Sequence, residues 1–401
     1  MHALFLALLF LIPPAGSAPT HAQDKPSDTF EALAKQAADA QSTNHLDEAL
    51  DLYRRSVALR PTWDEGWWSI GMLTYDQDKY SDCAAAFRRF RSLKPDLAPG
   101  WTMSGLCEYR LRQYDAAYQS LLQAERLGFQ GAPELARSGR LHLALLATKN
   151  SSFEHAILLC GILFRSAEST PEAVAVAGVA ALGRPLLLSE VPEFDRPLVM
   201  ALGNALAAAY AKPAAEAIEK FQSAIQAYPD VADIHYRFGA YLLKSDQARA
   251  LAEIRRALAL DPSHLPSLIA MSLESLHSDD AAAARRYAEQ AVKVAPGNYA
   301  SHLMLGRALL LEFKSTGLDT TATGNSLPAK GSAAAKGRPP NPSLRAAISE
   351  LEAAAKLDPE SQDAHFSLSS AYALAGRAAA AARERAEYER LQKLNTARTG
   401  I

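Results

Sequence analysis

The chain places apolar residues at helical spacing in one segment after another, and prolines interrupt this pattern at nearly equal intervals. The sequence positions of Pro61 and Pro95 differ by 34, as do those of Pro262 and Pro296, and those of Pro229 and Pro262 differ by 33. A similar short sequence ends at each proline, namely SVALRP, RSLKP, SAIQAYP, RALALDP, AVKVAP and, later, AAAKLDP. Because proline in a helix interior costs about 3 kcal/mol, the pattern predicts that a helix ends at each of these prolines.

An alanine-rich amphipathic helix is predicted before each proline, as in LDEALDLYRRSVAL, and another after it, as in DEGWWSIGMLTY. Alanine is the best helix former and is depleted from strands, so the predicted fold class is all-α. Trp67 and Trp101 are separated by the same interval as Pro61 and Pro95, and so are Gly71 and Gly105. The small residue in the first helix of each pair lets the second helix approach closely, while the large ring fills the space between successive pairs.

These phased residues resemble the tetratricopeptide repeat (TPR) family, in which a repeat of this length forms one helix pair. The matching residues are Trp67, Ile70, Gly71, Phe87, Pro95, Trp101, Gly105, Ala117, Ala124, Ala217, Phe221, Ala224, Pro229, Gly239, Ala250, Ala257, Pro262, Leu305, Gly306, Leu351, Ala354 and Pro359. The resemblance covers most of residues 30–397. It implies a right-handed superhelical solenoid of antiparallel helix pairs, with a non-catalytic function in binding.

The phase of the repeats divides the chain into two arrays. An N-terminal array is predicted over 30–167, and its last repeat, 132–167, is degenerate. A C-terminal array follows over 198–313, and the final hairpins with a capping helix occupy 343–401. The capping helix is long and polar, which suits the exposed end of a solenoid. We therefore expect about nine stacked helix pairs rather than two or three globular domains.

Three segments depart from the repeat. Residues 168–197 contain one predicted helix, Ala173 to Leu182, followed by a proline-broken stretch, so we expect an irregular helical connector that caps or kinks the array. Phe129 stands where a proline would fall, which predicts an atypical turn. Residues 314–342 account for 29 extra positions and are rich in Gly, Ala, Ser, Thr and Pro, so they are predicted to form a disordered insertion.

The first residues have the layout of a secretory signal peptide. Residues 3–12 read ALFLALLFLI, prolines follow this run, and the sequence THA offers a cleavage site that ends at Ala22. The run is about half of the roughly 20 residues that cross a bilayer, and no later stretch approaches that length. We predict a cleaved signal peptide over 1–22, a linker over 23–29 and a secreted or periplasmic protein of the exported bacterial type. The alternative is a cytosolic protein with an apolar terminus.

Charge and motif content narrow the function further. The 42 Lys and Arg residues balance 44 Asp and Glu residues, a net charge of −2, which excludes a basic nucleic-acid binder. No phosphate loop, GxGxxG, HExxH or GxSxG sequence occurs, so neither an enzyme nor a cofactor is predicted. The three cysteines form no CxxC pair. Cys160 is expected to fill the core, and whether Cys83 and Cys107 pair stays open.

Three histidines recur at one position of the repeat. His235, His302 and His365 stand where Trp67 and Trp101 stand in earlier repeats, once the insertion is subtracted. Such a recurrence suits either a metal site or simple packing. Stacked helices lie about 8–10 Å apart, whereas zinc holds its nitrogen ligands at about 2 Å. Packing is therefore the favoured interpretation, and no metal is predicted.

TPR arrays hold their partners in a concave groove that is lined by the first helix of each pair. The equivalent positions in the repeats of this chain give nine candidate partner-binding residues: Trp68, Met72, Tyr75, Thr102, Leu106, Tyr109, Tyr236, Arg307 and Phe366. Lysine and asparagine, which family members use to bind carboxylates, are absent from this set. We therefore expect a largely apolar groove near Trp68, Tyr75 and Tyr109. The alternative is that neighbouring helices cover these side chains as part of the core.

The resemblance thus implies a scaffold or adaptor that binds a protein or peptide, with no nucleic-acid partner and no stable membrane span. Two alternatives remain. One is a structural subunit of a cell-envelope complex. The other is an enzyme or ligand-binding protein with a pocket near 168–197, lined by Glu190, Glu193 and Asp195. The partner and the oligomeric state stay open.

Overall fold

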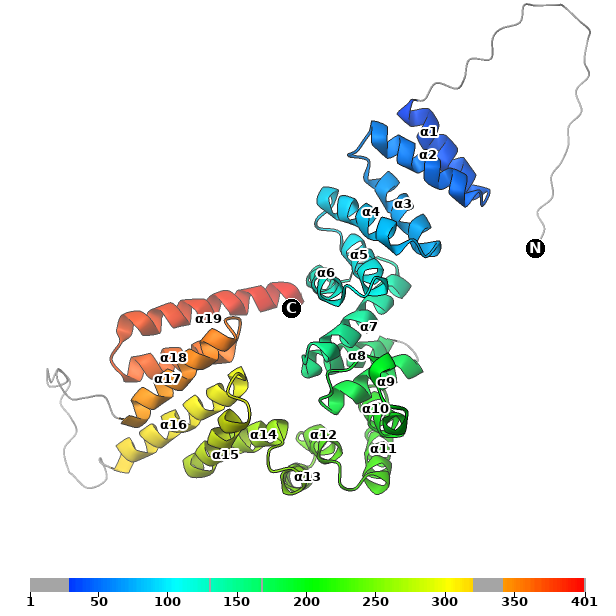
Figure 1. The fold of residues 1–401 in the computed structure, drawn as a ribbon. Coiled ribbons are helices and arrows are strands. Elements are labelled where there is room, and N and C mark those ends of the chain that lie inside the picture. Colours follow the sequence, from blue (N-terminus) through cyan, green and yellow to red (C-terminus); the bar gives the residue numbers. More distant parts are fainter. Residues whose placement is uncertain (1–28, 130, 167–168, 320–341, 400–401) are drawn as a thin grey trace, which may run out of the picture. The chain divides into compact units, whose positions relative to one another are not determined.

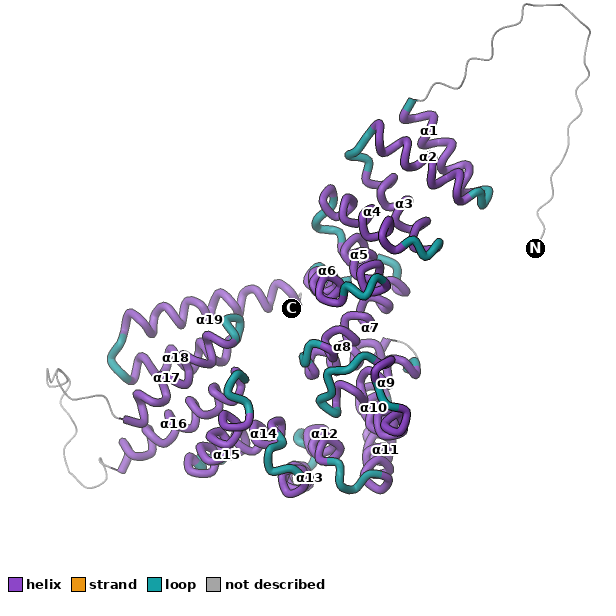
Figure 2. The backbone as a smooth tube through the Cα atoms, viewed as in Figure 1, coloured by secondary structure: helices purple, strands orange, loops and turns teal. Residues whose placement is uncertain are grey.

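A computed structural model describes residues 29–129, 131–166, 169–319 and 342–399, and every regular element within these ranges is helical (Figures 1 and 2). The chain divides into two compact units, and the boundary falls between Ser120 and Leu121 inside one helix. We call them the N-terminal and the C-terminal unit. The predicted signal peptide and nearly all of the linker lie outside the described residues. The expected all-α class is confirmed.

The N-terminal unit is built from successive antiparallel helix pairs. Its helices are α1 (Phe30–Ser42), α2 (Leu46–Leu59), α3 (Asp64–Asp76), α4 (Tyr80–Leu93), α5 (Ala98–Arg110) and the start of α6 (Tyr114–Arg126). Side chains such as Leu33, Leu50 and Ile70 form one buried core between these pairs. A methyl group on Gly71 would meet the Phe87 ring at 2.5 Å, so glycine is needed for the close approach that the sequence predicted.

The turn inside each pair repeats with the sequence period. Asn44, Asp78 and Arg112 follow one another at equal intervals of one repeat and have positive φ angles of 63°, 57° and 59°. The backbone N–H of the residue after each of them bonds back into the preceding helix, as His45 does to the Ala40 carbonyl at 2.8 Å. A left-handed residue of this kind commonly ends a helix. The position within the repeat therefore determines the backbone conformation of the turn as well as which side chains are buried.

The C-terminal unit continues the same architecture with more helices. They are α7 (Pro133–Lys149), α8 (Phe153–Ser166), α9 (Pro171–Ala181), α10 (Arg196–Ala211), α11 (Ala214–Ala227), α12 (Ala232–Leu242), α13 (Gln247–Leu260), α14 (Leu265–His277), α15 (Ala281–Val294), α16 (Tyr299–Asp319), α17 (Pro342–Leu357), α18 (Gln362–Leu374) and α19 (Ala378–Thr399). Two 3₁₀ turns, η1 (Leu188–Glu190) and η2 (Glu193–Asp195), lie between α9 and α10. The repeat predicted to be degenerate, 132–167, is an ordinary helix pair, α7 and α8.

The segment expected to interrupt the array does so only in part. Helix α9 packs against both α8 and α10, so it continues the stack instead of ending it. A methyl group on Gly178 of α9 would lie 2.0 Å from the Val199 carbonyl oxygen, and one on Gly203 of α10 would lie 2.1 Å from the Val174 carbonyl oxygen. The two backbones are therefore in direct contact. The stretch between them is irregular, as predicted.

Two other predicted features can be compared with the structure. The turn at Phe129 is atypical, because this residue has a positive φ of 48° and follows Gly128 at 83°. Helix α16 continues to Asp319, so residues 314–319 are helical, and the predicted start of the disordered insertion was wrong. The leucine-rich stretch before it, LMLGRALLLEF, favours a helix that extends past the expected boundary. The rest of the insertion up to residue 341 lies outside the described residues.

The last helix, α19, is the long polar helix that the sequence predicted at the end of the array. It packs against α18, and Leu391 is buried on its packed side. Among the described helices, none is both long and apolar enough to cross a membrane.

Candidate functional site

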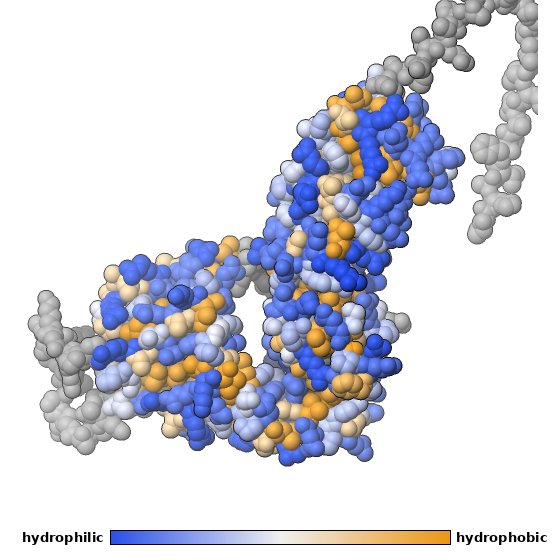
Figure 3. Space-filling model, viewed as in Figure 1, coloured by the Kyte–Doolittle hydropathy of each residue, from blue (hydrophilic) through white to orange (hydrophobic). Residues whose placement is uncertain are grey.

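In the N-terminal unit, the aromatic candidates lie half-buried along the first helices. The Trp68 ring contacts the rings of Phe87 and Phe90, with centroids 5.3 and 5.2 Å away. Tyr75 packs on Tyr80 in the same way, at 5.7 Å, and Met72 and Tyr109 are also partly exposed. Each of these side chains therefore has one side in the core and another at the surface. Figure 3 shows hydrophobic side chains reaching the surface of both units among polar ones.

Two candidates of the same unit belong to the core, so assigning them to a groove was wrong. Thr102 is 1% exposed and Leu106 is 4% exposed. The Thr102 hydroxyl donates to the Ala98 carbonyl at 3.0 Å within its own helix. Their helix, α5, is unusually enclosed, since nine of its 13 residues are buried. For these two residues the alternative interpretation, coverage by neighbouring helices, is the correct one.

In the C-terminal unit, the three remaining candidates have different surroundings. Tyr236 is partly buried beside the His264 ring, and burial raises the pKa of its phenol. Arg307 is engaged within the chain, because its Nη2 donates to Asp363 at 2.9 Å and its Nε donates to Ser367 at 3.0 Å. It therefore links α16 to α18. Phe366 is the most exposed candidate, with 52% of its surface accessible.

Sequence reasoning missed two apolar residues on the same face. Leu243 is 41% exposed at the end of α12, and Leu374 is 45% exposed at the end of α18. They follow Tyr236 and Phe366 by seven and eight residues, two helical turns further along the same face. That spacing was the signal in the sequence that could have found them. Both extend the exposed apolar face of the first helices.

The position shared by tryptophan and histidine has a specific role, and we call it the anchor position. Each anchor side chain donates a ring N–H to the carbonyl of the proline six residues earlier, which closed the preceding helix pair. The bonds are Trp67 to Pro61 at 2.9 Å, Trp101 to Pro95 at 2.8 Å, His235 to Pro229 at 2.9 Å, His302 to Pro296 at 2.9 Å and His365 to Pro359 at 3.1 Å. The predicted equivalence of these five residues is confirmed. They bind successive pairs to one another by hydrogen bonding as well as by packing.

One repeat fills this role from a different helix. Leu268 stands six residues after Pro262 and has no N–H in its side chain. Instead Gln290, on α15, donates its amide to the Pro262 carbonyl at 2.6 Å. The Pro262 carbonyl therefore still accepts a side-chain hydrogen bond, although the anchor side chain of this repeat is apolar. Among the described residues, no three His, Cys, Asp or Glu side chains lie together as a metal-binding group.

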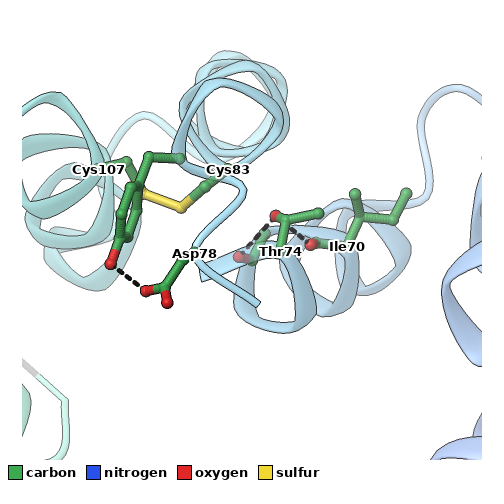
Figure 4. The surroundings of a disulfide bond; sticks show 7 residues. Ile70, Thr74, Asp78, Cys83 and Cys107 are labelled. Carbon is green, nitrogen blue, oxygen red and sulfur yellow. Dashed lines mark hydrogen bonds between the residues drawn. A yellow bond between two sulfur atoms is a disulfide. The ribbon is translucent and has the colours of Figure 1, made fainter. Parts of the chain in front are cut away.

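The pairing that the sequence left open is settled. Cys83 of α4 and Cys107 of α5 form a disulfide, with their Cα atoms 6.0 Å apart (Figure 4). This distance lies within the usual range for disulfides. The bond joins the second helix of one pair to the first helix of the next. Cys160 is a free, buried thiol, and burial raises its pKa to about 12, so it stays protonated at neutral pH.

The carboxylates proposed for a pocket in the irregular segment are engaged elsewhere or exposed. Glu190 accepts from the Leu187 N–H at 2.7 Å and from Lys149 at 3.0 Å, and these bonds lower its pKa. Asp195 pairs with Arg184 at 2.6 Å, and Glu193 is exposed. A cavity of about 220 Å³ lies nearby, but apolar side chains and one arginine line it, and none of the three carboxylates does. These three carboxylates therefore form no convergent acidic site.

Comparisons with known proteins agree with this arrangement. The family model "Tetratricopeptide repeat" matches residues 276–314 and 343–391, which include α15, α18 and most of α16 and α17. Comparison with curated proteins finds no significant match.

Several solved structures resemble the chain at low identity. MamA from Desulfovibrio magneticus RS-1 is 18% identical, covering 45% of this chain and 85% of its own, with a TM-score of 0.34. YrrB is 15% identical, covering 61% and 93%, with a TM-score of 0.28. A Parabacteroides merdae repeat protein is 12% identical, covering 70% and 98%, with a TM-score of 0.34. These scores are too low to support an argument about function. Residues 276–314 and 343–391 are therefore tetratricopeptide repeats, and the other described helices form helix pairs of the same kind.

Proposed function

We propose that this protein is a non-catalytic scaffold that binds a protein or peptide on the exposed apolar face of its first helices. The observation that carries the proposal is the row of half-buried side chains on α3 and α5, namely Trp68, Met72, Tyr75 and Tyr109. Neighbouring rings already hold Trp68 and Tyr75 in place, so little side-chain entropy is lost when a partner covers them. A partner that matches this face presents apolar side chains of its own.

The size of the available contact supports this choice. A large aromatic side chain buries about 150–250 Å² when it is fully covered. At about 25 cal/mol per Å², covering the exposed half of two such rings contributes roughly 4–6 kcal/mol before the costs of association. Methionine adds a flexible and polarisable contact that adapts to different partners. In the C-terminal unit, Phe366 and Leu374 offer a second face of the same character.

We propose further that the protein acts outside the cytosol, after export and cleavage of residues 1–22. Two independent features support export: the apolar leader, and the Cys83–Cys107 disulfide. Structural disulfides persist in oxidising compartments and are rare in the cytosol. Mass mapping of the protein from fractionated cells tests this proposal. An intact leader together with two free thiols would refute it.

A double variant, Tyr75→Ala with Tyr109→Ala, tests the binding face while leaving Trp68 in the core. The mature protein and the variant are used for affinity capture from the native envelope fraction, followed by mass spectrometry. We expect the variant to capture its partner at least about tenfold more weakly, or about 1.4 kcal/mol, with unchanged helicity.

The matched control is Leu59→Ala, which removes an apolar side chain that is 55% exposed on a second helix of the same unit. It should leave capture unchanged. Equal capture by the wild type and the double variant would refute the binding face. A partner that co-purifies in fixed ratio with both would instead indicate a structural subunit of a larger complex.

A further inference from the structure

The three anchor histidines make a second contact that the tryptophans do not. In each, Nε2 faces the proline carbonyl, while Nδ1 faces a glutamate on the second helix of the pair. The Nδ1 to carboxylate distances are 2.7 Å from His235 to Glu253, 2.6 Å from His302 to Glu350 and 2.7 Å from His365 to Glu384. The same three-part contact therefore occurs in three repeats of the C-terminal unit.

This geometry fixes how many protons each contact holds. A carbonyl oxygen only accepts hydrogen bonds, and so does an ionised carboxylate, whereas a neutral imidazole has only one N–H. Both bonds can form together only if the histidine–glutamate pair holds one proton more than a neutral ring beside a carboxylate. That proton sits either on Nδ1, as an imidazolium, or on the carboxyl group. In both cases the proton belongs to the pair, and losing it removes one of the two bonds.

The rings are well shielded from water. The side chains of His235, His302 and His365 are only 7%, 14% and 11% exposed. The charged groups that face them are Glu253 on α13, Glu350 on α17, and Glu384 and Glu387 on α19. The pKa of Glu387 is lowered, first by its hydrogen bond to Arg390 and more weakly by the charge of His365. All four of these groups are acidic.

For His302 the balance of effects can be stated. Burial lowers the pKa of this ring, but the hydrogen bonds to the Pro296 carbonyl and to Glu350, together with the Glu350 charge, outweigh burial, and the pKa is raised. A histidine with a raised pKa in the folded state contributes stability that is fully present below the unfolded value of about 6.5. This stability is lost as the pH rises through the folded pKa. The stability that His302 contributes is therefore lost on the alkaline side.

The N-terminal unit has no such proton at its anchor positions. Trp67 and Trp101 donate an indole N–H, which does not titrate in water. At the anchor position the N-terminal unit thus has tryptophans, whereas three repeats of the C-terminal unit have histidines. Tryptophan keeps the contact at every pH, and histidine makes it conditional.

We propose that the three histidine–glutamate pairs are a pH-sensitive device, which holds the helix pairs of the C-terminal unit tightly together in mildly acidic solution and loosens them as the solution becomes alkaline. Loosening begins where α12, α16 and α18 contact the prolines that precede them. The N-terminal unit keeps its packing over the same range. This property goes beyond partner binding and does not depend on it.

Amide hydrogen exchange of the full-length protein between about pH 6 and pH 9 tests the device, with rates corrected for intrinsic exchange. We expect protection in α12, α16 and α18 to fall by about tenfold across this range, as one charge-assisted hydrogen bond per pair is lost. Protection in α3 and α5 should stay constant and serves as the internal control. Constant protection in all five helices would overturn the proposal.

A triple variant, Glu253→Gln, Glu350→Gln and Glu384→Gln, separates this device from other titrating groups. A glutamine amide donates to Nδ1 of a neutral ring, so both bonds persist without the extra proton. We expect the variant to fold and to lose the pH dependence in α12, α16 and α18. The same pH dependence in wild type and variant would overturn the proposal.

If the triple variant does not fold, each single variant tests one pair by the exchange of its own helix, with the same criterion. Nuclear magnetic resonance titration of His302 gives a second readout in the wild type. A midpoint above about 6.5 is expected, and a midpoint at or below that value would overturn the assignment.

Discussion

Reduction of the Cys83–Cys107 disulfide is expected to destabilise the N-terminal unit and to leave the C-terminal unit unchanged. The bond ties α4 to α5, across the boundary between two helix pairs. Within a repeat array each pair contacts only its neighbours, so a link at such a boundary acts on both. Using a reductant instead of a substitution leaves both buried side chains in place and creates no cavity.

The size of the effect follows from the loop that the disulfide closes. The two cysteines are separated by 24 positions in the sequence. In the chain-entropy treatment, a cross-link over such a loop stabilises the folded state by about 3.5 kcal/mol. With a slope of about 2 kcal/mol per M in urea, the unfolding midpoint of the N-terminal unit should fall by roughly 1.5–2 M.

The assay uses the position of the tryptophans. All four, Trp63, Trp67, Trp68 and Trp101, lie in the N-terminal unit, so tryptophan fluorescence, excited selectively over tyrosine, reports on that unit alone. Urea unfolding is followed by fluorescence and by far-ultraviolet circular dichroism, with and without reductant. The fluorescence transition should shift, while the part of the dichroism transition that comes from the C-terminal unit should not.

The control is the double variant Cys83→Ser with Cys107→Ser, on which reductant should have no effect. A wild-type fluorescence midpoint that is the same in both redox states would refute the reasoning. It would mean that packing between α4 and α5 alone determines the stability of this boundary.

Three further predictions concern single residues. Gly178→Ala should cost at least about 1–3 kcal/mol in thermal unfolding, because its methyl group would meet the Val199 carbonyl, whereas Gly297→Ala, with no atom within 4 Å, should be neutral or slightly stabilising. Trp101→Phe removes the indole N–H that the Pro95 carbonyl accepts and should lower the stability of the N-terminal unit by about 1 kcal/mol, measured by circular dichroism. Cys160 should resist a thiol reagent in the folded protein at neutral pH and react after unfolding, as mass spectrometry would show. Fast labelling of the folded state would contradict its burial.

The helix pairs and their period were predictable from the sequence because their signals are local. Proline, alanine and glycine act on their own backbone or on the adjacent helix, and these effects recur once in every repeat. The same phase correctly placed Trp67, Trp101 and the three histidines at one position. The extension of α16 to Asp319 was missed, because composition alone does not say where an apolar helix stops.

The candidate binding face was predictable only in part. Phase gives the direction of a side chain from its own helix, and it correctly directed Tyr75 and Phe366 to the surface. It does not say which helix lies opposite, so Thr102 and Leu106 were assigned to a groove although they are buried. Arg307 was expected at the surface for the same reason, but it bonds to residues 56 and 60 positions away.

By itself, then, the sequence determined the all-α class, the repeat and the residues that face along each helix. Only the tertiary structure decided that Cys83 meets Cys107, that α9 contacts α10 through two glycines, and that each anchor histidine lies between a carbonyl and a carboxylate. The physical reason is distance along the chain. Short-range preferences act within one helix or turn, whereas these contacts join different helices, and their distances depend on how the helices pack.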